Sequence, residues 1–181
     1  MINMIKNIDD YIVDNMPKIH TKGLIITMRI FTQLGNQAKV WFAMCIPLLI
    51  IKSTRLLACT VLLAMLITVI TGEGIIKHCV CRVRPCSAIE EEKHVVKKPT
   101  TIYSFPSGHS ASSFTVCTVL IMNRMWPLAI PAVIIGLLIA FSRLYLLVHY
   151  LTDVIVGIIL GVLCGFFSVQ IMDYVVTHYF S

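Results

Sequence analysis

Long intervals that lack charged residues constrain this chain more than any other feature of its sequence. Residues 56–76, 125–142 and 154–172 form intervals of 21, 18 and 19 residues, and Glu73 is the one charged residue within them. A helix that crosses the hydrocarbon core of a bilayer needs about 20 mostly apolar residues. These three intervals therefore predict helices that span a membrane.

The composition agrees with a lipid environment. Hydrophobic residues make up 57% of the chain and charged residues 13%, whereas soluble domains carry roughly 25% charged residues. Backbone polar groups in lipid must be paired within the protein, and helices meet that requirement for runs of this kind. We predict an all-α, polytopic bundle of about six transmembrane helices, over residues 23–36, 38–52, 56–77, 106–123, 126–146 and 153–176.

The first 22 residues differ from the rest of the chain because they are polar and amphipathic. Four apolar residues recur there at helical spacing: Ile5, Ile8, Ile12 and Met16. This periodicity predicts a helix with one apolar face. We expect residues 1–22 to lie along the membrane surface and residues 23–181 to form one transmembrane domain.

One sizeable loop, residues 78–105, joins the third and fourth predicted helices. It begins with a cluster of cysteines, Cys79, Cys81 and Cys86, and also contains Arg82, which we interpret as a residue that solvates the loop. A metal site would need a second cluster of ligands with matching spacing, and the sequence contains none. We therefore expect no metal, and inert thiols or an occasional disulfide instead.

The order of the helices brings several polar residues to one face of the membrane. The helix over 56–77 ends on the face where the helix over 106–123 begins, and the helix over 126–146 returns to it. Seven polar residues are thus expected to converge there: Lys77, Arg84, Ser107, His109, Arg143, His149 and Asp153.

The residue types in this set suit the binding of a phosphoryl group. Positive charges and hydrogen-bond donors stabilise the equatorial oxygens of a transferring phosphoryl group, and the set includes three cations: Lys77, Arg84 and Arg143. Pro106 is suited to a first helical position. The free backbone N–H groups that follow, at Ser107 and Gly108, would bind an anion.

The remaining residues suit nucleophilic catalysis. On a helix, His149 and Asp153 would share a face, and Asp153 would accept the proton of Nδ1 and leave Nε2 free as a nucleophile. His109 would serve as the general acid. Glu73 precedes Lys77 by four residues, so we expect an ion pair that supports the lysine.

Each residue has a plainer interpretation when it is taken alone. Lysines and arginines snorkel at membrane interfaces, and a carboxylate near a helix N-terminus is favoured by the helix dipole. The combination on one membrane face favours a phosphate site.

These residues lie in three short motifs. The first is Lys77, six residues, then Arg84-Pro85; the second is Pro106-Ser107-Gly108-His109; the third is Ser142-Arg143, five residues, His149, three residues, Asp153. In order and spacing the motifs resemble those of the type 2 phosphatidic acid phosphatase (PAP2) superfamily: K-x6-R-P, P-S-G-H and S-R-x5-H-x3-D. The segments Leu34-Gly35-Asn36 and Tyr103-Ser104-Phe105 also resemble small bacterial members.

This resemblance implies an integral-membrane lipid phosphatase that needs no metal or other cofactor. In such an enzyme His149 would form a phosphohistidine, His109 would protonate the leaving group, and Asp153 would orient the nucleophile. The phosphate would be held by Lys77, Arg84, Ser107, Gly108 and Arg143.

The resemblance also implies a class of substrate and a location. On the resemblance to small bacterial members, our first choice of substrate is undecaprenyl diphosphate, which would give undecaprenyl phosphate, and the alternatives are phosphatidylglycerophosphate, phosphatidate and lipid A phosphates. The expected location is the plasma membrane, with the active site on the extracytoplasmic face. The soluble haloperoxidases of the superfamily do not fit a chain this short and apolar.

The net charge of +6 suits anionic lipid headgroups and an anionic substrate. We expect a lipid phosphate and the bilayer as partners, no nucleic acid, and no obligate protein partner. A hypothesis of another class remains open, namely a membrane protein that binds a lipid phosphate without hydrolysing it.

Overall fold

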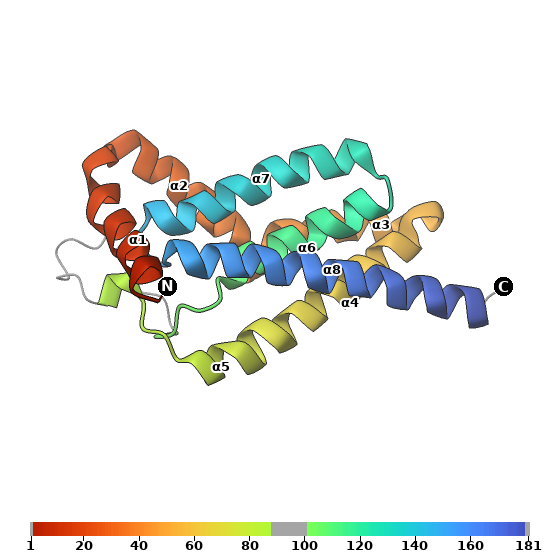
Figure 1. The fold of residues 1–181 in the computed structure, drawn as a ribbon. Helices are drawn as coiled ribbons and strands as arrows, with labels where there is room; N and C mark the ends of the chain where they lie inside the picture. The colour runs from red at the N-terminus through yellow and green to blue at the C-terminus, as the bar shows by residue number, and fades with distance from the viewer. Residues whose placement is uncertain (1, 88–100, 180–181) are drawn as a thin grey trace.

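The computed structural model of the chain describes residues 2–87 and 101–179, and within them it is an all-α bundle (Figure 1). Each predicted helical range corresponds to one helix, and the ends agree to within a few residues except that α4 ends at Val69, eight residues before the predicted end at 77. The six are α2 (Lys22–Gly35), α3 (Lys39–Ile50), α4 (Arg55–Val69), α6 (Gly108–Met122), α7 (Trp126–Tyr145) and α8 (Leu151–Tyr179).

Three helices in the described part of the chain are long and apolar enough to cross a membrane: Lys52–Val80, Trp126–Tyr145 and Leu151–Tyr179. The first of them is composite, because α4 continues through a π-helical turn, Ile70–Ile76, into α5 (Lys77–Val80). Glu73 lies within this turn. The predicted all-α membrane bundle is confirmed in its class.

The bundle is apolar inside and outside. Its main core lies between α3, α4, α6 and α7 and includes Trp41, Val61, Leu120 and Ile139. Large apolar side chains such as Ile134 are exposed on the outer surface. A surface of this kind suits lipid contact rather than water.

Helix α8 approaches α6 closely because of three glycines at intervals of four residues, Gly157, Gly161 and Gly165. A Cβ atom at Gly157 would lie 2.6 Å from the backbone oxygen of Ser107, and one at Gly165 would lie 2.9 Å from that of Thr115. Small residues at this spacing let two membrane helices approach at backbone distance. As a result the two helices begin side by side, and Ser107 N donates to the backbone oxygen of Asp153 at 2.9 Å.

Helix α1 (Ile2–Asn15) lies at the end of the bundle where α8 begins, and the C-terminus lies at the opposite end (Figure 1). Its most deeply buried described residue is Asp9, with 1% of its surface exposed, whereas Met4 and Ile8 are exposed. The apolar periodicity of this segment predicted the helix and did not predict the residue that the helix buries. That α1 lies along the membrane surface remains a prediction.

Candidate active site

The residues of the three motifs gather at the end of the bundle covered by α1. Lys77 begins α5, Arg84 follows in the segment after it, and His109 is the second residue of α6. Arg143 stands in the last turn of α7, and Asp153 stands in the first turn of α8. Most are deeply buried: Lys77, Arg84, Ser107, Arg143, His149 and Asp153 are all at most 7% exposed.

His149 and Arg84 are in direct contact. Arg84 Nη1 lies 2.9 Å from His149 Nε2 and also donates to the backbone oxygen of Val148. A guanidinium group has donors and no acceptor, so Nε2 must carry a lone pair and the ring proton is assigned to Nδ1. Burial holds the pKa of His149 well below its ordinary value, and Arg143, Arg84 and Lys77 shift it in the same direction. His149 is therefore a neutral imidazole at physiological pH.

The predicted hydrogen bond between Asp153 and His149 is not formed. Asp153 Oδ2 is 3.5 Å from His149 Nδ1, and this nitrogen has no hydrogen-bond partner within the described residues. The four-residue spacing fails as a guide because His149 precedes the first residue of α8 and is not helical. Asp153 Oδ2 accepts instead from the backbone N–H of Tyr150 at 3.0 Å, as an N-terminal helix cap.

Arg82 does not simply solvate the loop, as the sequence suggested. Its Nη1 donates to Asp153 Oδ1 at 2.8 Å, and its Nη2 donates to Asp9 Oδ2 at 2.7 Å. The guanidinium also stacks over the ring of Tyr150, 3.8 Å from its centroid. Burial alone would lower the pKa of Arg82, but the hydrogen bonds and charges of Asp9 and Asp153 raise it above its ordinary value.

Lys77 forms the ion pair that its spacing from Glu73 predicted. Lys77 Nζ is 2.7 Å from Glu73 Oε1 and 2.6 Å from Oε2. Glu73 also approaches the start of α6 so closely that a Cβ atom at Gly108 would collide with Glu73 Oε1. Glycine at this position therefore lets the carboxylate of the ion pair lie against the start of α6.

Helix α2 supports His109 and Arg143 through a residue that the sequence did not single out. Arg143 Nη1 donates to Thr32 Oγ1, and the backbone of Thr32 lies within hydrogen-bonding reach of the His109 ring. One turn later, a Cβ atom at Gly35 would lie 2.8 Å from Cδ2 of His109. The neighbouring Leu34-Gly35-Asn36 segment was the available signal that α2 approaches the site.

Two of the site's cations have no anionic partner among the described residues. Arg84 donates to uncharged groups, among them the backbone oxygen and the hydroxyl of Thr101. Among these residues Arg143 donates to the hydroxyl of Thr32, and its buried Nε finds no hydrogen-bond partner there. A buried charge is costly unless it is paired, so this arrangement is suited to binding an anion with several oxygens.

The described residues contain no group of three or more histidines, cysteines or carboxylates that could hold a metal ion. All seven cysteines are free thiols, and of the predicted cluster Cys79 and Cys81 are exposed while Cys86 is buried. Residues 88–100 of the predicted loop lie outside the described residues.

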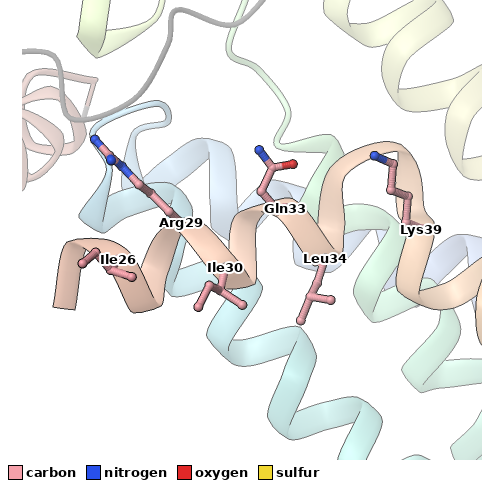
Figure 2. A pocket seen from close by; sticks show the side chains of 6 residues that line it. All are labelled: Ile26, Arg29, Ile30, Gln33, Leu34 and Lys39. Carbon is pink, nitrogen blue, oxygen red and sulfur yellow. The ribbon is translucent and has the colours of Figure 1, made fainter. Parts of the chain in front are cut away.

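A separate open groove of about 540 Å³ follows α2. Figure 2 shows that, among the lining residues, Arg29 and Gln33 point to one side of α2 and Ile30 and Leu34 point to the other. Its lining contains no residue of the three motifs: Ile26, Arg29, Ile30, Gln33, Leu34 and Lys39. The groove is therefore distinct from the cluster around His149.

Comparisons with known proteins agree on one family. Residues 56–176 match the PAP2 superfamily. The undecaprenyl-diphosphatase of Sulfolobus acidocaldarius is 33% identical over 147 residues, which are 80% of this chain and 69% of that protein. The decaprenylphosphoryl-5-phosphoribose phosphatase of Mycobacterium tuberculosis is 44% identical over 62 residues, 34% of this chain and 33% of that protein.

Two solved structures share the fold. A PAP2-type phosphatidylglycerolphosphate phosphatase from Bacillus subtilis superposes with a TM-score of 0.76 over 96% of this chain and 88% of that one, at 24% identity. LpxE from Aquifex aeolicus superposes with a TM-score of 0.69 over 90% of this chain and 94% of that one, also at 24% identity.

Proposed function

Since the chain belongs to the PAP2 superfamily, we propose that it hydrolyses a lipid phosphate or diphosphate through a phosphohistidine formed on His149. The observation that carries this proposal is the pair of buried guanidinium groups, Arg84 and Arg143, whose described partners are uncharged and which lie around a neutral imidazole. A phosphoryl group supplies the oxygens that these cations lack.

Phosphate binding requires Arg84 to change partner. Its Nη1 now donates to the Nε2 lone pair of His149, and that lone pair must be free to attack phosphorus. In the proposed complex Arg84 and Arg143 turn to the phosphate oxygens, with Lys77 and the N–H group of Gly108. The oxygens thereby gain charge-assisted hydrogen bonds, and Nε2 becomes a nucleophile in line with the leaving group. The N–H of Ser107, which the sequence suggested as a second backbone donor, already donates to the backbone oxygen of Asp153 at 2.9 Å.

In the proposed reaction His149 is the nucleophile, and His109 donates and then recovers a proton. Nε2 of His149 forms a bond to phosphorus while the bond from phosphorus to the leaving oxygen breaks, and His109 gives its proton to that oxygen. A water oxygen then bonds to phosphorus while the bond from phosphorus to Nε2 breaks, and the water gives one proton to His109. Inorganic phosphate leaves, and both histidines return to their initial state.

Our first choice of substrate is undecaprenyl diphosphate, which would yield undecaprenyl phosphate and inorganic phosphate and so recycle the carrier lipid of the cell wall. The support is the similarity to the undecaprenyl-diphosphatase of Sulfolobus acidocaldarius across 80% of the chain. Phosphatidylglycerophosphate, phosphatidate and lipid A phosphates are the alternative substrates.

We further propose that all six bundle helices cross the plasma membrane and that the site opens on its extracytoplasmic face. Native thiols offer a test of this orientation, because exposed Cys79 and Cys81 lie at the site end of the bundle. A membrane-impermeant maleimide should label them in intact cells. Labelling that requires permeabilised cells would place the site on the cytoplasmic face instead.

The test of the function is phosphate release by the detergent-purified protein. The substrates are undecaprenyl diphosphate, phosphatidylglycerophosphate and phosphatidate, each with and without EDTA. His149→Ala is compared with His178→Ala, a matched control, because His178 is exposed in the last turn of α8. EDTA-resistant release that is lost in His149→Ala and kept in His178→Ala is the expected result, and the fastest lipid identifies the substrate.

Protein quenched in alkali during turnover should also retain phosphate covalently when His149 is present, because the P–N bond of a phosphohistidine is stable to base and is hydrolysed in acid. Turnover of any of these lipids by His149→Ala at the wild-type rate would refute the phosphohistidine. Binding of a lipid phosphate without release from any substrate would favour the non-catalytic hypothesis.

A further inference from the structure

Helix α1 contributes a buried carboxylate to a network that reaches the site, and the three motifs do not include it. Asp9 Oδ2 accepts from Arg82 Nη2 at 2.7 Å and from the hydroxyl of Thr152 at 2.6 Å. Asp9 Oδ1 accepts from the backbone N–H of Thr152 at 3.0 Å. Asp9 therefore caps the N-terminus of α8 from another helix.

Arg82 joins this cap to the carboxylate next to His149. Its two terminal nitrogens contact two different carboxylates, Asp9 and Asp153, and Nη1 also donates to the hydroxyl of Thr152 at 2.6 Å. Asp9 and Asp153 are each at most 1% exposed. Two buried carboxylates need a compensating cation, and Arg82 supplies the same positive charge to both.

The network also determines which groups Asp153 can contact. Arg82 holds Oδ1, and the Tyr150 N–H holds Oδ2, so the carboxylate stays 3.5 Å from Nδ1 of His149. A second constraint comes from the backbone, because the Asp153 oxygen accepts from Ser107 N. A shift of Asp153 would therefore reach both the imidazole and the start of α6.

We propose that Asp9 and Arg82 are positioning residues that hold Asp153 beside His149, so that helix α1 is part of the catalytic unit. Neither residue touches the reacting atoms in this scheme. The inference rests on the proposed function, since Asp9 and Arg82 would act on the nucleophile His149 only through Asp153.

The variants follow from the contacts. Asp9→Asn keeps an oxygen for the Thr152 N–H and removes the charge opposite Arg82. Arg82→Met removes the bridge, and Arg82→Lys retains the charge without the fork that contacts both carboxylates. Asp14→Asn is the matched control, because it makes the same change on the same helix at an exposed position.

We expect Asp9→Asn and Arg82→Met to lower kcat by about ten- to a hundredfold while KM stays within about threefold, because misplacing a reacting group costs rate rather than affinity. Arg82→Lys should recover part of the loss. The double variant should be no slower than Arg82→Met alone, since Asp9 acts through Arg82. Losses that multiply in the double variant would overturn the proposal.

The pH profile distinguishes positioning from a merely structural role. Without Arg82, the Asp153 charge is no longer compensated and is free to turn to Nδ1, which favours the imidazolium form of His149. The acidic limb of kcat/KM should then move to higher pH. The groups that face His149 are kept in every variant: Lys77, Arg84, His109, Arg143 and Asp153.

Folding is monitored by thermal unfolding in detergent on the same samples. A rate that falls only in proportion to the folded fraction, with an unchanged pH profile, would overturn the proposal. Loss of release in His149→Ala together with wild-type kinetics in Asp9→Asn would refute the positioning role and leave the proposed function standing.

Discussion

Gly157 offers a sharp test of the link between helix packing and chemistry. A Cβ atom at this position would lie 2.6 Å from the backbone oxygen of Ser107 and 3.2 Å from Cβ of Ser110. Ordinary van der Waals contact begins near 3.4 Å, so Gly157→Ala requires α6 and α8 to separate by about 0.8 Å. The atom that must move is backbone, and no rotamer change can relieve the contact.

The displacement acts directly on the site. Ser107 donates to the backbone oxygen of Asp153 at 2.9 Å, and His109 lies two residues further along α6. A shift approaching 1 Å at reacting groups can cost about a hundredfold in rate. Overpacking of this kind also destabilises by about 1–3 kcal/mol. We therefore expect Gly157→Ala to lower kcat by roughly ten- to a hundredfold and to lower the Tm.

Two further glycines serve as controls for the same change. A Cβ atom at Gly23 would meet nothing within 4 Å, so Gly23→Ala should keep wild-type kcat and stability or gain slightly in stability. A Cβ atom at Gly165 would lie 2.8 Å from Cβ of Thr118, two turns further from the site. Gly165→Ala should lower the Tm with a smaller effect on kcat.

The assay measures steady-state phosphate release and thermal unfolding on the same detergent preparations. Wild-type kcat and Tm in Gly157→Ala would refute the argument that backbone contact between α6 and α8 positions the site.

Three other predictions follow from the site. Burial holds the pKa of His149 well below its ordinary value of 6.5, so its nucleophilic neutral form persists as the pH falls. The acidic limb of kcat/KM should therefore have its midpoint well below 6.5, and a midpoint at the ordinary histidine value would contradict this. Glu73→Gln should raise KM several-fold, because Lys77 loses the carboxylate at 2.6 Å that orients it; unchanged steady-state constants would show that the ion pair is dispensable. His109→Ala should be severely impaired on lipid substrates yet recover on an activated aryl phosphate, whose leaving group needs no proton; equal loss on both would weaken the assignment of His109 as the acid.

Local patterns in the sequence were enough to predict the helices of the bundle and one ion pair of the site. Charge-free intervals predicted the helices because the cost of an unpaired backbone group in lipid leaves few alternatives. The Glu73–Lys77 ion pair followed from their spacing, since both residues lie on one continuous helix. Gly157, Gly161 and Gly165 recur at the four-residue spacing of small residues in packed membrane helices, but the sequence analysis did not use this spacing to pair α6 with α8.

The rule that residues four apart share a helix face failed for His149 and Asp153, because it assumed that both residues lie on one helix. His149 lies ahead of α8, and Asp153 therefore contacts Tyr150 and Arg82 and not Nδ1 of His149. Pro106 likewise precedes the Ser107 N-cap of α6, where a first helical position was expected. Helix ends depend on which cap competes best, and that competition involves residues beyond the local pattern.

The sequence by itself determined the all-α membrane class, the family and the set of residues that lie at one end of the bundle. Only the tertiary structure decided how those residues pair. Arg82 meets Asp9 across 73 positions of sequence, and Thr32 meets Arg143 across 111. Such contacts depend on the angles and distances at which helices pack, and the periodicity of one helix contains no information about which partner a buried charge will find.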